Sequence, residues 1–351
     1  MAYTTIDDPS AHFHTRLYSG NGSTQSITNN ANAGNFKPDW LWIKERTSTS
    51  QNFLFDSNRG VGKYLHSDST SSEGNDVHNT SFDSNGFGVG QQNGTNENSQ
   101  TYVAWQWVAN GGTTSSNSNG DITSTVQTNS TAGFSIGTYT GDADNSHSVG
   151  HGLGATPAWI IVKRREGSHS WIVWHQNLTA TSAYAVDLEN TDAEANNTSY
   201  FHDTAPDANT FHPGDGGATN GSGGTYVFYA FKEIKGYSKF GSYKGNGNAN
   251  GAFIYTGFRP AWIMVKLISG SGEDWHIFDS SRSTSNVVKE RLIASGSAAE
   301  NANDSILDFV SNGFKFKESN AGWNGNGNTY IYMAFAEHPF VSSKGVPVTA
   351  R

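Results

Sequence analysis

The stretch PAWIMVK at residues 260–266 occurs in two further versions, PDWLWIK at residues 38–44 and PAWIIVK at residues 157–163. In each version a proline comes first, a tryptophan follows two positions later, and a lysine ends an apolar run. Proline fixes φ and has no N–H to donate, so it suits the first residue of a strand rather than its middle. A short apolar run with β-branched and aromatic residues is typical of a strand that is buried on both faces. We therefore predict three equivalent buried strands.

Further motifs recur in the same order around these strands. A turn of the type Tyr-x-Gly precedes each proline, and an aromatic strand follows each lysine. Each set ends with a closing strand: TYVAWQW at 101–107, TYVFYAF at 225–231 and TYIYMAF at 329–335. Side chains alternate between the faces of a strand, so Val103, Trp105 and Trp107 share one apolar face that we expect in the core. Asn-Gly pairs at residues 85–86 and 312–313 predict type I′ hairpin turns, and the middle set lacks this pair.

The spacing of these motifs divides the chain into units. We predict an N-terminal arm (1–11), a first unit (12–109), a flexible linker rich in Gly, Thr, Ser and Asn (110–132), a second unit (133–235), a third unit (236–340) and a C-terminal tail (341–351). The second and third units are joined directly, which favours a rigid pair. The two arms are expected either to anchor the chain to neighbours in an assembly or to fray. Each unit is long enough for one sandwich with its own core. The predicted fold class is all-β, with three tandem antiparallel β-sandwich repeats of the jelly-roll or lectin-like type.

Composition excludes several classes of protein. The chain has no cysteine, so neither disulfides nor thiolate metal sites are expected. Only 15% of the residues are charged and the net charge is −9, which argues against a nucleic-acid partner. No apolar run is long enough to span a membrane, and the N-terminus lacks the features of a signal peptide. A polar, Asn- and Gly-rich surface without an export signal fits a virion component that is assembled in a host cytoplasm and released by lysis. The alternatives are an ordinary cytoplasmic protein and a chain whose signal has been trimmed.

The order of these motifs resembles a domain that occurs in tandem in structural proteins of marine bacteriophages, in tail-fibre or other virion-surface proteins. The motifs are Tyr-x-Gly-Asn-Gly, Pro-x-Trp, Phe-Asp-Ser-x-Arg, Ser-Asn-Gly-Phe and Tyr-Val-Ala-Trp, and residues 1–10 and 345–351 resemble the same group. The resemblance implies a non-enzymatic virion role with no catalytic residues to transfer. The leading expectation is a surface appendage or fibre component that contacts host surface glycans, and the alternative is a capsid decoration protein on the phage head. Other virion proteins are the expected partners, and a homo-oligomer is expected, with a trimer favoured.

Two groups of residues are candidates for a site. Asp56 with Arg59, and Asp279 with Arg282, follow the aromatic strands within reach of the strand-ending lysines. A carboxylate beside a guanidinium forms charge-assisted hydrogen bonds, which either pin a loop, the favoured interpretation, or grip a ligand. The second unit has His175 and Leu178 at the matching positions, so it must differ there.

The second group of candidates lies in a polar loop before the last strand. Trp323, Asn324 and Asn326 are candidates for glycan contact, because an aromatic ring stacks on the C–H face of a sugar while amides read its hydroxyls. The same composition serves any long turn.

A competing function class is a carbohydrate-active enzyme. Glycoside hydrolysis needs two carboxylates about 5–9.5 Å apart, and Asp187 with Glu189 is the strand-like candidate pair. A solvated strand end is the favoured interpretation of that pair. Residues 142–145 could offer calcium hard oxygens, but a fitting bidentate glutamate is missing, so a polar turn is predicted. His147 and His151 lie in a Gly-rich turn, and His169 and His175 lie across a strand, so no zinc site is predicted. No cofactor is expected, since no phosphate-binding loop or nucleophile elbow is present.

Overall fold

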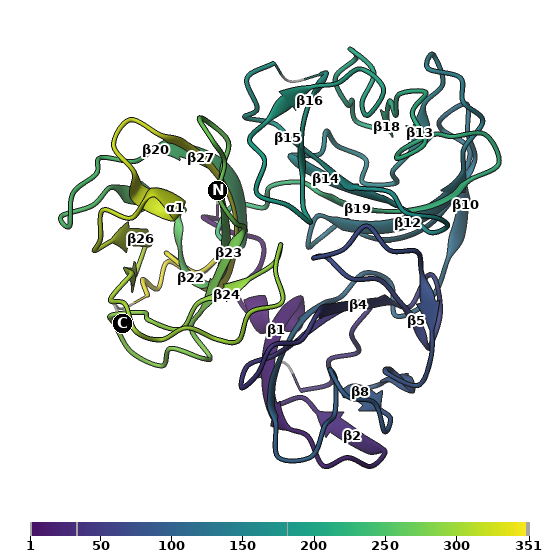
Figure 1. Cartoon of the computed structure of the whole chain (residues 1–351). Coiled ribbons are helices and arrows are strands. Elements are labelled where there is room, and N and C mark those ends of the chain that lie inside the picture. Colours follow the sequence, from purple (N-terminus) through teal and green to yellow (C-terminus); the bar gives the residue numbers. More distant parts are fainter. Residues whose placement is uncertain (1, 33, 181, 349–351) are drawn as a thin grey trace.

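The protein is an all-β molecule of three lobes grouped around a common centre (Figure 1). The computed structural model describes residues 2–32, 34–180 and 182–348. Within these residues the helical elements are the short α1 (Ala321–Asn324) and the 3-10 turn η1 (Pro9–Ala11). The predicted all-β, antiparallel fold class is confirmed. We call the lobes 1, 2 and 3; they contain β1–β9, β10–β19 and β20–β27. No helix among the described residues is long and apolar enough to cross a membrane.

Each lobe has one large antiparallel sheet, and the three large sheets share an arrangement of four strands. In lobe 1 the order is β1 (Phe13–Ser19), β9 (Thr101–Trp107), β3 (Trp40–Glu45) and β4 (Asn52–Asp56). In lobe 2 it is β12 (Phe134–Thr140), β19 (Thr225–Phe231), β14 (Trp159–Arg164) and β15 (Trp171–His175). In lobe 3 it is β20 (Ser238–Lys244), β27 (Thr329–Pro339), β22 (Phe258–Leu267) and β23 (His276–Asp279), with β24 (Leu292–Ile293) beyond. The strand that carries the Pro-x-Trp motif therefore lies inside each sheet, between two neighbours.

Smaller sheets cover the outer face of each large sheet. They are β2 (Gln25–Thr28), β8 (Gly86–Val89) and β7 (Ser81–Asp83) in lobe 1, β13 (Val149–Gly150) and β18 (Thr210–Phe211) in lobe 2, and β21 (Phe253–Tyr255), β26 (Gly313–Phe316) and β25 (Leu307–Val310) in lobe 3; β5 (Lys63–Tyr64) pairs with β6 (Gly74–Asn75). Ile27 and Phe87 of lobe 1 pack with Leu41 and Ile43 of the large sheet in one core. Lobes 2 and 3 have cores of the same kind. Each lobe is thus a sandwich.

Hairpins do form at the Asn-Gly pairs, between β7 and β8 and between β25 and β26, but the asparagine ends each loop and the glycine opens the second strand. The predicted turn type is wrong, however, because of these four residues only Gly86 has a positive φ, of +131°. A Cβ atom on Gly86 would lie 2.0 Å from the carbonyl oxygen of Ile27, and one on Gly313 would lie 2.0 Å from that of Ile254. Glycine is required here because a neighbouring strand approaches the backbone closely.

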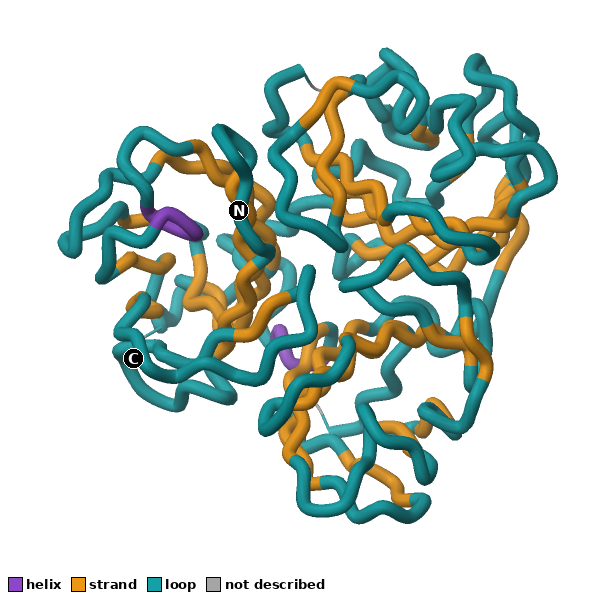
Figure 2. Tube along the Cα trace, in the orientation of Figure 1, coloured by secondary structure: helices purple, strands orange, loops and turns teal. Residues whose placement is uncertain are grey.

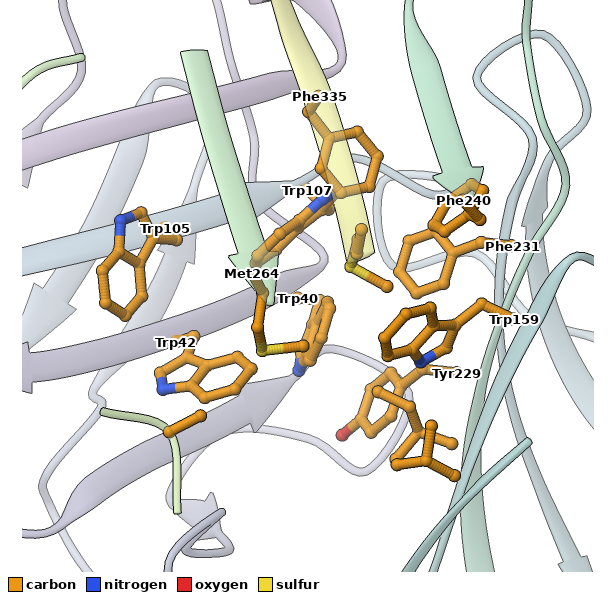
Figure 3. Close-up of a cluster of buried hydrophobic side chains, with 14 of the residues drawn as sticks. Trp40, Trp42, Trp105, Trp107, Trp159, Tyr229, Phe231, Phe240, Met264 and Phe335 are labelled. Carbon is orange, nitrogen blue, oxygen red and sulfur yellow. The ribbon is translucent and has the colours of Figure 1, made fainter. Parts of the chain in front are cut away.

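The inner faces of the three large sheets meet in a central aromatic cluster (Figure 3). On β9, Val103, Trp105 and Trp107 belong to this cluster, whereas Tyr102 and Ala104 belong to the core of lobe 1. The apolar face that the sequence places in a core is therefore buried, but in a core that the three lobes share. Figure 2 shows the long strands on the sides of the lobes that face the centre, with loops forming most of the outer rim.

The three motif tryptophans all lie in the central cluster, and each meets an aromatic ring of another lobe. Trp40 of lobe 1 stacks on Tyr229 of lobe 2, with ring centroids 4.5 Å apart. Trp159 of lobe 2 packs on Trp275 of lobe 3 at 5.7 Å. Trp262 of lobe 3 packs on Trp107 of lobe 1, also at 5.7 Å. Each lobe therefore packs its tryptophan against the next lobe, and the three contacts close a ring.

The predicted linker is an ordered part of lobe 2. It contains β10 (Ser115–Asn117) and β11 (Ser124–Asn129), which extend one edge of the large sheet, while β16 (Tyr184–Asp187) and β17 (Ala195–Asn196) extend the other. Its first residues are held as well, because the buried Asp39 carboxylate accepts hydrogen bonds from the N–H groups of Ala109, Gly111 and Gly112. The expectation of a flexible linker is wrong because the segment also contains β-forming residues, such as Thr125, Val126 and Thr128 of β11. The expected rigid pair of units 2 and 3 is likewise not distinguished from the other pairs, since all three lobes share one core.

The proline-first prediction needs a similar correction in lobe 3. Pro38 and Pro157 precede their strands, but Pro260 lies inside β22 at a register shift next to Arg259. A bulge is one of the few places in a sheet where the missing N–H of proline is tolerated.

The N-terminal arm packs on lobe 3. Ile6 is buried, the Tyr3 hydroxyl donates to the Gly257 carbonyl oxygen at 2.8 Å, and Asp7 accepts from the backbone N–H of Ser343 at 2.6 Å. The arm thereby ties lobe 1 back to lobe 3. The predicted tail 341–351 is described only to residue 348, and residues 349–351 and Met1 lie outside the described residues.

Candidate functional site

The candidates Asp56 and Arg59 lie in the seam between lobes 1 and 2, with fully buried side chains. Arg59 Nε donates to Asp56 Oδ2 at 2.5 Å, and its backbone N–H donates to Asp56 Oδ1 at 2.7 Å. The hydroxyl of Tyr229, from lobe 2, donates to the same Oδ2 atom at 2.6 Å. The carboxylate therefore holds its own loop and also binds the next lobe.

Glu73 continues this network across the seam. Its carboxylate lies 3.1 Å from Arg59 of lobe 1 and 2.8 Å from Arg165 of lobe 2. Burial acts to raise the pKa of Glu73, but the hydrogen bonds and charges of Arg165 and Arg59 outweigh it, so its pKa lies below the usual range. Neither Glu73 nor Arg165 was a candidate from the sequence, because no local motif marks them.

The same network recurs between lobes 3 and 1. Arg282 Nε donates to Asp279 Oδ2 at 2.5 Å, and the indole N–H of Trp105 donates to that oxygen at 3.0 Å. Glu300 then joins Arg282, at 2.9 Å, to Arg46 of lobe 1, at 2.7 Å. These two clusters are too deeply buried to grip a ligand from solution. The pinning interpretation fits them, with the addition that they pin lobes to one another.

The third seam, between lobes 2 and 3, uses other chemistry. In the strand register, the motif tryptophan of lobe 2 pairs with His175. The motif tryptophans of lobes 1 and 3 pair with Asp56 and Asp279. The position of the hydrogen-bond donor, Tyr229 or Trp105 in the other seams, is taken by Met333, which has no donor. Burial lowers the pKa of His175 to about 3, so the imidazole is neutral at pH 7. His175 Nδ1 accepts a hydrogen bond from the backbone N–H of Asn177 at 3.0 Å, and the neutral ring places no charge in this seam.

The motif lysines are also used within the seams. Lys44, Lys163 and Lys266 are fully buried, and burial lowers the pKa of each to about 8. Each ammonium group donates to a backbone carbonyl oxygen of another lobe: Lys44 to Ser297 at 3.1 Å, Lys163 to Thr70 at 2.9 Å and Lys266 to Thr191 at 2.8 Å. These lysine contacts run from lobe 1 to lobe 3, from lobe 3 to lobe 2 and from lobe 2 to lobe 1. The tryptophan contacts run around the ring in the opposite direction, from lobe 1 to lobe 2, then to lobe 3 and back to lobe 1.

The predicted glycan contact of Trp323 is wrong. Its indole is fully buried in the core of lobe 3, with the ring centroid of His276 at 5.1 Å and the Arg291 guanidinium at 5.3 Å. No face of the ring is free to stack on a sugar. Asn326 is exposed, whereas Asn324 is buried.

Asn324 clamps loops. Its Nδ2 donates to the side chain of Asn246 at 3.0 Å and to the carbonyl oxygens of Asn248 and Glu318 at 2.9 and 2.7 Å. Asn96 and Asn220 hold the equivalent turns in lobes 1 and 2. The sequence did contain a signal for this trio, since each asparagine stands five residues before the Thr-Tyr that opens a closing strand.

We expect Asn324→Asp to destabilise the fold by at least about 1–3 kcal/mol, because a carboxylate would face three oxygen atoms that now receive hydrogen bonds. Asn326→Asp, two residues away and exposed, is the matched control and should change stability by less than about 0.5 kcal/mol. Thermal and urea unfolding of the two variants measures the difference. Equal effects would show that the asparagine clamp is unimportant.

The carboxylate pair of the enzymatic alternative lies at the seam of lobes 2 and 3. Glu189 accepts from the backbone N–H of Trp171 at 2.9 Å, and the backbone oxygen of Asp187 accepts from the indole of Trp275 at 2.9 Å. Burial, and then the charge of Glu189, raises the pKa of Asp187 to about 6. These contacts fit a strand end. A general acid also has a raised pKa, as Asp187 does. The enzymatic alternative stays a prediction.

The acidic turn considered for calcium holds a histidine. His147 lies 2.6 Å from Asp142 and 3.7 Å from Asp144. Over the described part of the chain, no group of three His, Asp or Glu side chains is placed to hold a metal ion.

The exposed aromatic side chains gather at the open side of lobe 3. We call this feature the edge groove; it lies between the edge strands β20 and β21 and contains Tyr3, Glu233, Lys239, Phe253 and Tyr255. Two adjoining hollows of about 390 and 330 Å³ make up the groove and share Lys239 and Tyr255. Phe253 and Tyr255 are 50% and 54% exposed, which is unusual for large apolar side chains and marks a candidate contact surface.

Comparison with known proteins adds one family. A domain of unknown function (DUF7483) matches residues 8–339, from the residue that caps η1 to the last residue of β27. The match spans all three lobes as a single domain. No curated protein and no solved structure matches the chain.

Proposed function

We propose that this chain, which belongs to the DUF7483 family of domains of unknown function, is a non-enzymatic structural protein on the surface of a bacteriophage virion. The motif resemblance described above supplies the link to virions. The observation that carries the structural role is the closed ring of three lobes. Buried carboxylates, guanidiniums and ammonium groups join one lobe to the next.

The closed ring also bears on how such a protein would assemble. The aromatic faces through which three separate sandwiches would associate are already buried inside one chain. This favours a single chain that attaches to a preformed surface, as a capsid decoration protein does, over a fibre built from a homotrimer. Within the proposal, the alternative of a head decoration protein therefore moves ahead of the fibre component.

Size-exclusion chromatography with light scattering tests the assembly. The expected mass is that of one chain, 37.8 kDa. A stable trimer would contradict the single-chain arrangement and favour the fibre. Cryo-EM of the intact particle tests the role itself, because a three-lobed density should be found on the particle surface. Particles that lack this density, although the protein is produced during infection, would overturn the virion role.

The enzymatic class has its own test. The protein is incubated with bacterial surface polysaccharide and the release of reducing ends is measured. We expect none. Release that is lost in the double variant Asp187→Asn/Glu189→Gln, with an unchanged melting temperature, would replace the structural proposal with a glycosidase.

A further inference from the structure

We infer that the edge groove of lobe 3 binds an oligosaccharide of pyranose sugars. The inference rests on the proposed surface function for its biological sense, since a virion protein meets the glycans of its host. Its physical basis is the arrangement of Phe253, Tyr255, Tyr3 and the ion pair of Lys239 with Glu233.

Two exposed aromatic side chains of β21 form a platform. Phe253 and Tyr255 flank Ile254 on β21. Side chains alternate along a strand, so both rings project to the solvent side while Ile254 points into the core of lobe 3. Residues two apart on a strand lie roughly 7 Å apart, which lets two rings meet neighbouring sugars of one chain. A pyranose offers an apolar C–H face that covers such a ring and removes it from water.

Tyr255 of the platform is held in position before any ligand arrives. The hydroxyl of Tyr255 lies 3.2 Å from that of Tyr3, which in turn donates to the Gly257 carbonyl oxygen at 2.8 Å. The Lys235 ammonium lies over the Tyr3 ring, 4.5 Å from its centre. Because the Tyr255 ring is already placed, it loses little conformational entropy on binding.

Side chains of both charges form a polar rim of the groove. Lys239 and Glu233 form an ion pair of 2.9 Å and remain 38% and 31% exposed in their side chains. The Glu233 carboxylate is oriented by donors from the Gln176 side chain and the Phe240 backbone, each at 3.1 Å. A fixed acceptor beside a fixed donor suits vicinal hydroxyl groups, which donate and accept at once.

The same contacts disfavour an added peptide strand. The outward N–H of Phe240 on β20 already donates to Glu233, and its carbonyl oxygen accepts from Gln176 at 2.7 Å. On the other side β21 has only three residues. Strand addition depends on a run of free backbone groups along an edge, which the groove does not supply at this point.

The test uses the full chain and a panel of defined hexasaccharides: maltohexaose, cellohexaose, laminarihexaose and chitohexaose. Saturation-transfer NMR detects binding, and calorimetry measures the affinity of any sugar that binds. The double variant Phe253→Ala/Tyr255→Ala should weaken that affinity by at least about tenfold. The control Val61→Ala/Val77→Ala removes two side chains of 50% exposure each from lobe 1 and should leave it unchanged. Melting temperatures confirm that both variants fold.

The outcomes separate this inference from the proposed function. Failure of every hexasaccharide to bind, or equal binding by both double variants, overturns the saccharide site and leaves the particle-surface role to its own cryo-EM test. A dimer in light scattering that Phe253→Ala/Tyr255→Ala dissociates also overturns it, because the groove would then be the contact between two copies of the chain.

Discussion

Asp56→Ala is expected to destabilise the protein by about 3–5 kcal/mol, although the side chain touches neither solvent nor any groove. The substitution leaves the Arg59 guanidinium buried without the carboxylate that now faces it at 2.5 Å. It also removes the acceptor of the Tyr229 hydroxyl in the next lobe. Urea unfolding followed by fluorescence measures the loss, and Asp279→Ala, in the matching network of the lobe 3–lobe 1 seam, should give a similar value.

The control is an exposed ion pair. Asp308 lies 3.4 Å from Lys317, and the side chains of the two residues are 22% and 40% exposed. Asp308→Ala should therefore cost less than about 1 kcal/mol. If Asp56→Ala costs no more than Asp308→Ala, the seam clusters do not hold the lobes together. Asp56→Asn, which keeps an oxygen for Tyr229 but not the charge for Arg59, should fall between the two.

The three seams show that the carboxylate and the facing donor belong together. Asp56 faces Tyr229 and Asp279 faces Trp105, and both partners donate. The third position combines His175 with Met333, neither of which brings a buried charge at pH 7. The second unit thus departs from the Asp-x-x-Arg pattern in the seam where the donor position is a methionine, 158 positions away on another sheet.

The strands were predictable because their patterns are local. The proline, the apolar run and the terminal lysine of each Pro-x-Trp motif identify a buried inner strand, and burial on both faces was correct. What covers the inner face was not predictable. An alternating strand shows that a face is buried, and it does not show whether the cover is the same lobe or another.

The site was less predictable, for two physical reasons. The glutamates that complete the seams come from loops, and their partners lie 92 and 254 residues away in the chain, so no spacing rule finds them. The second reason is that the exposure of aromatic side chains does not follow from the polarity of the surrounding sequence. Trp323 lies in a polar loop and is buried, whereas Phe253 and Tyr255 lie on a strand and are exposed, because they are on the outer face of β21, opposite to the buried Ile254.

Trp40→Ala is expected to cost about 3–5 kcal/mol and to loosen two lobes at once. Trp40 packs on Trp107 of its own lobe, at 4.4 Å between ring centroids, and on Tyr229 of lobe 2, at 4.5 Å. A cavity at this point therefore removes contacts from both inner faces. Amide hydrogen exchange should report faster opening in β9 and in β19, together with the lower unfolding midpoint in urea.

Trp323→Ala is the matched control, since it removes an equally buried tryptophan from the private core of lobe 3. Its total cost should be similar, but faster exchange should stay within lobe 3, around β22, β26 and β27. The two substitutions should therefore lower the free energy of unfolding by similar amounts. They should differ in whether amide exchange becomes faster in two lobes or in one. If Trp40→Ala leaves the exchange of β19 unchanged, the lobes are independent bodies that merely touch, and the closed ring on which the proposed structural role depends does not exist.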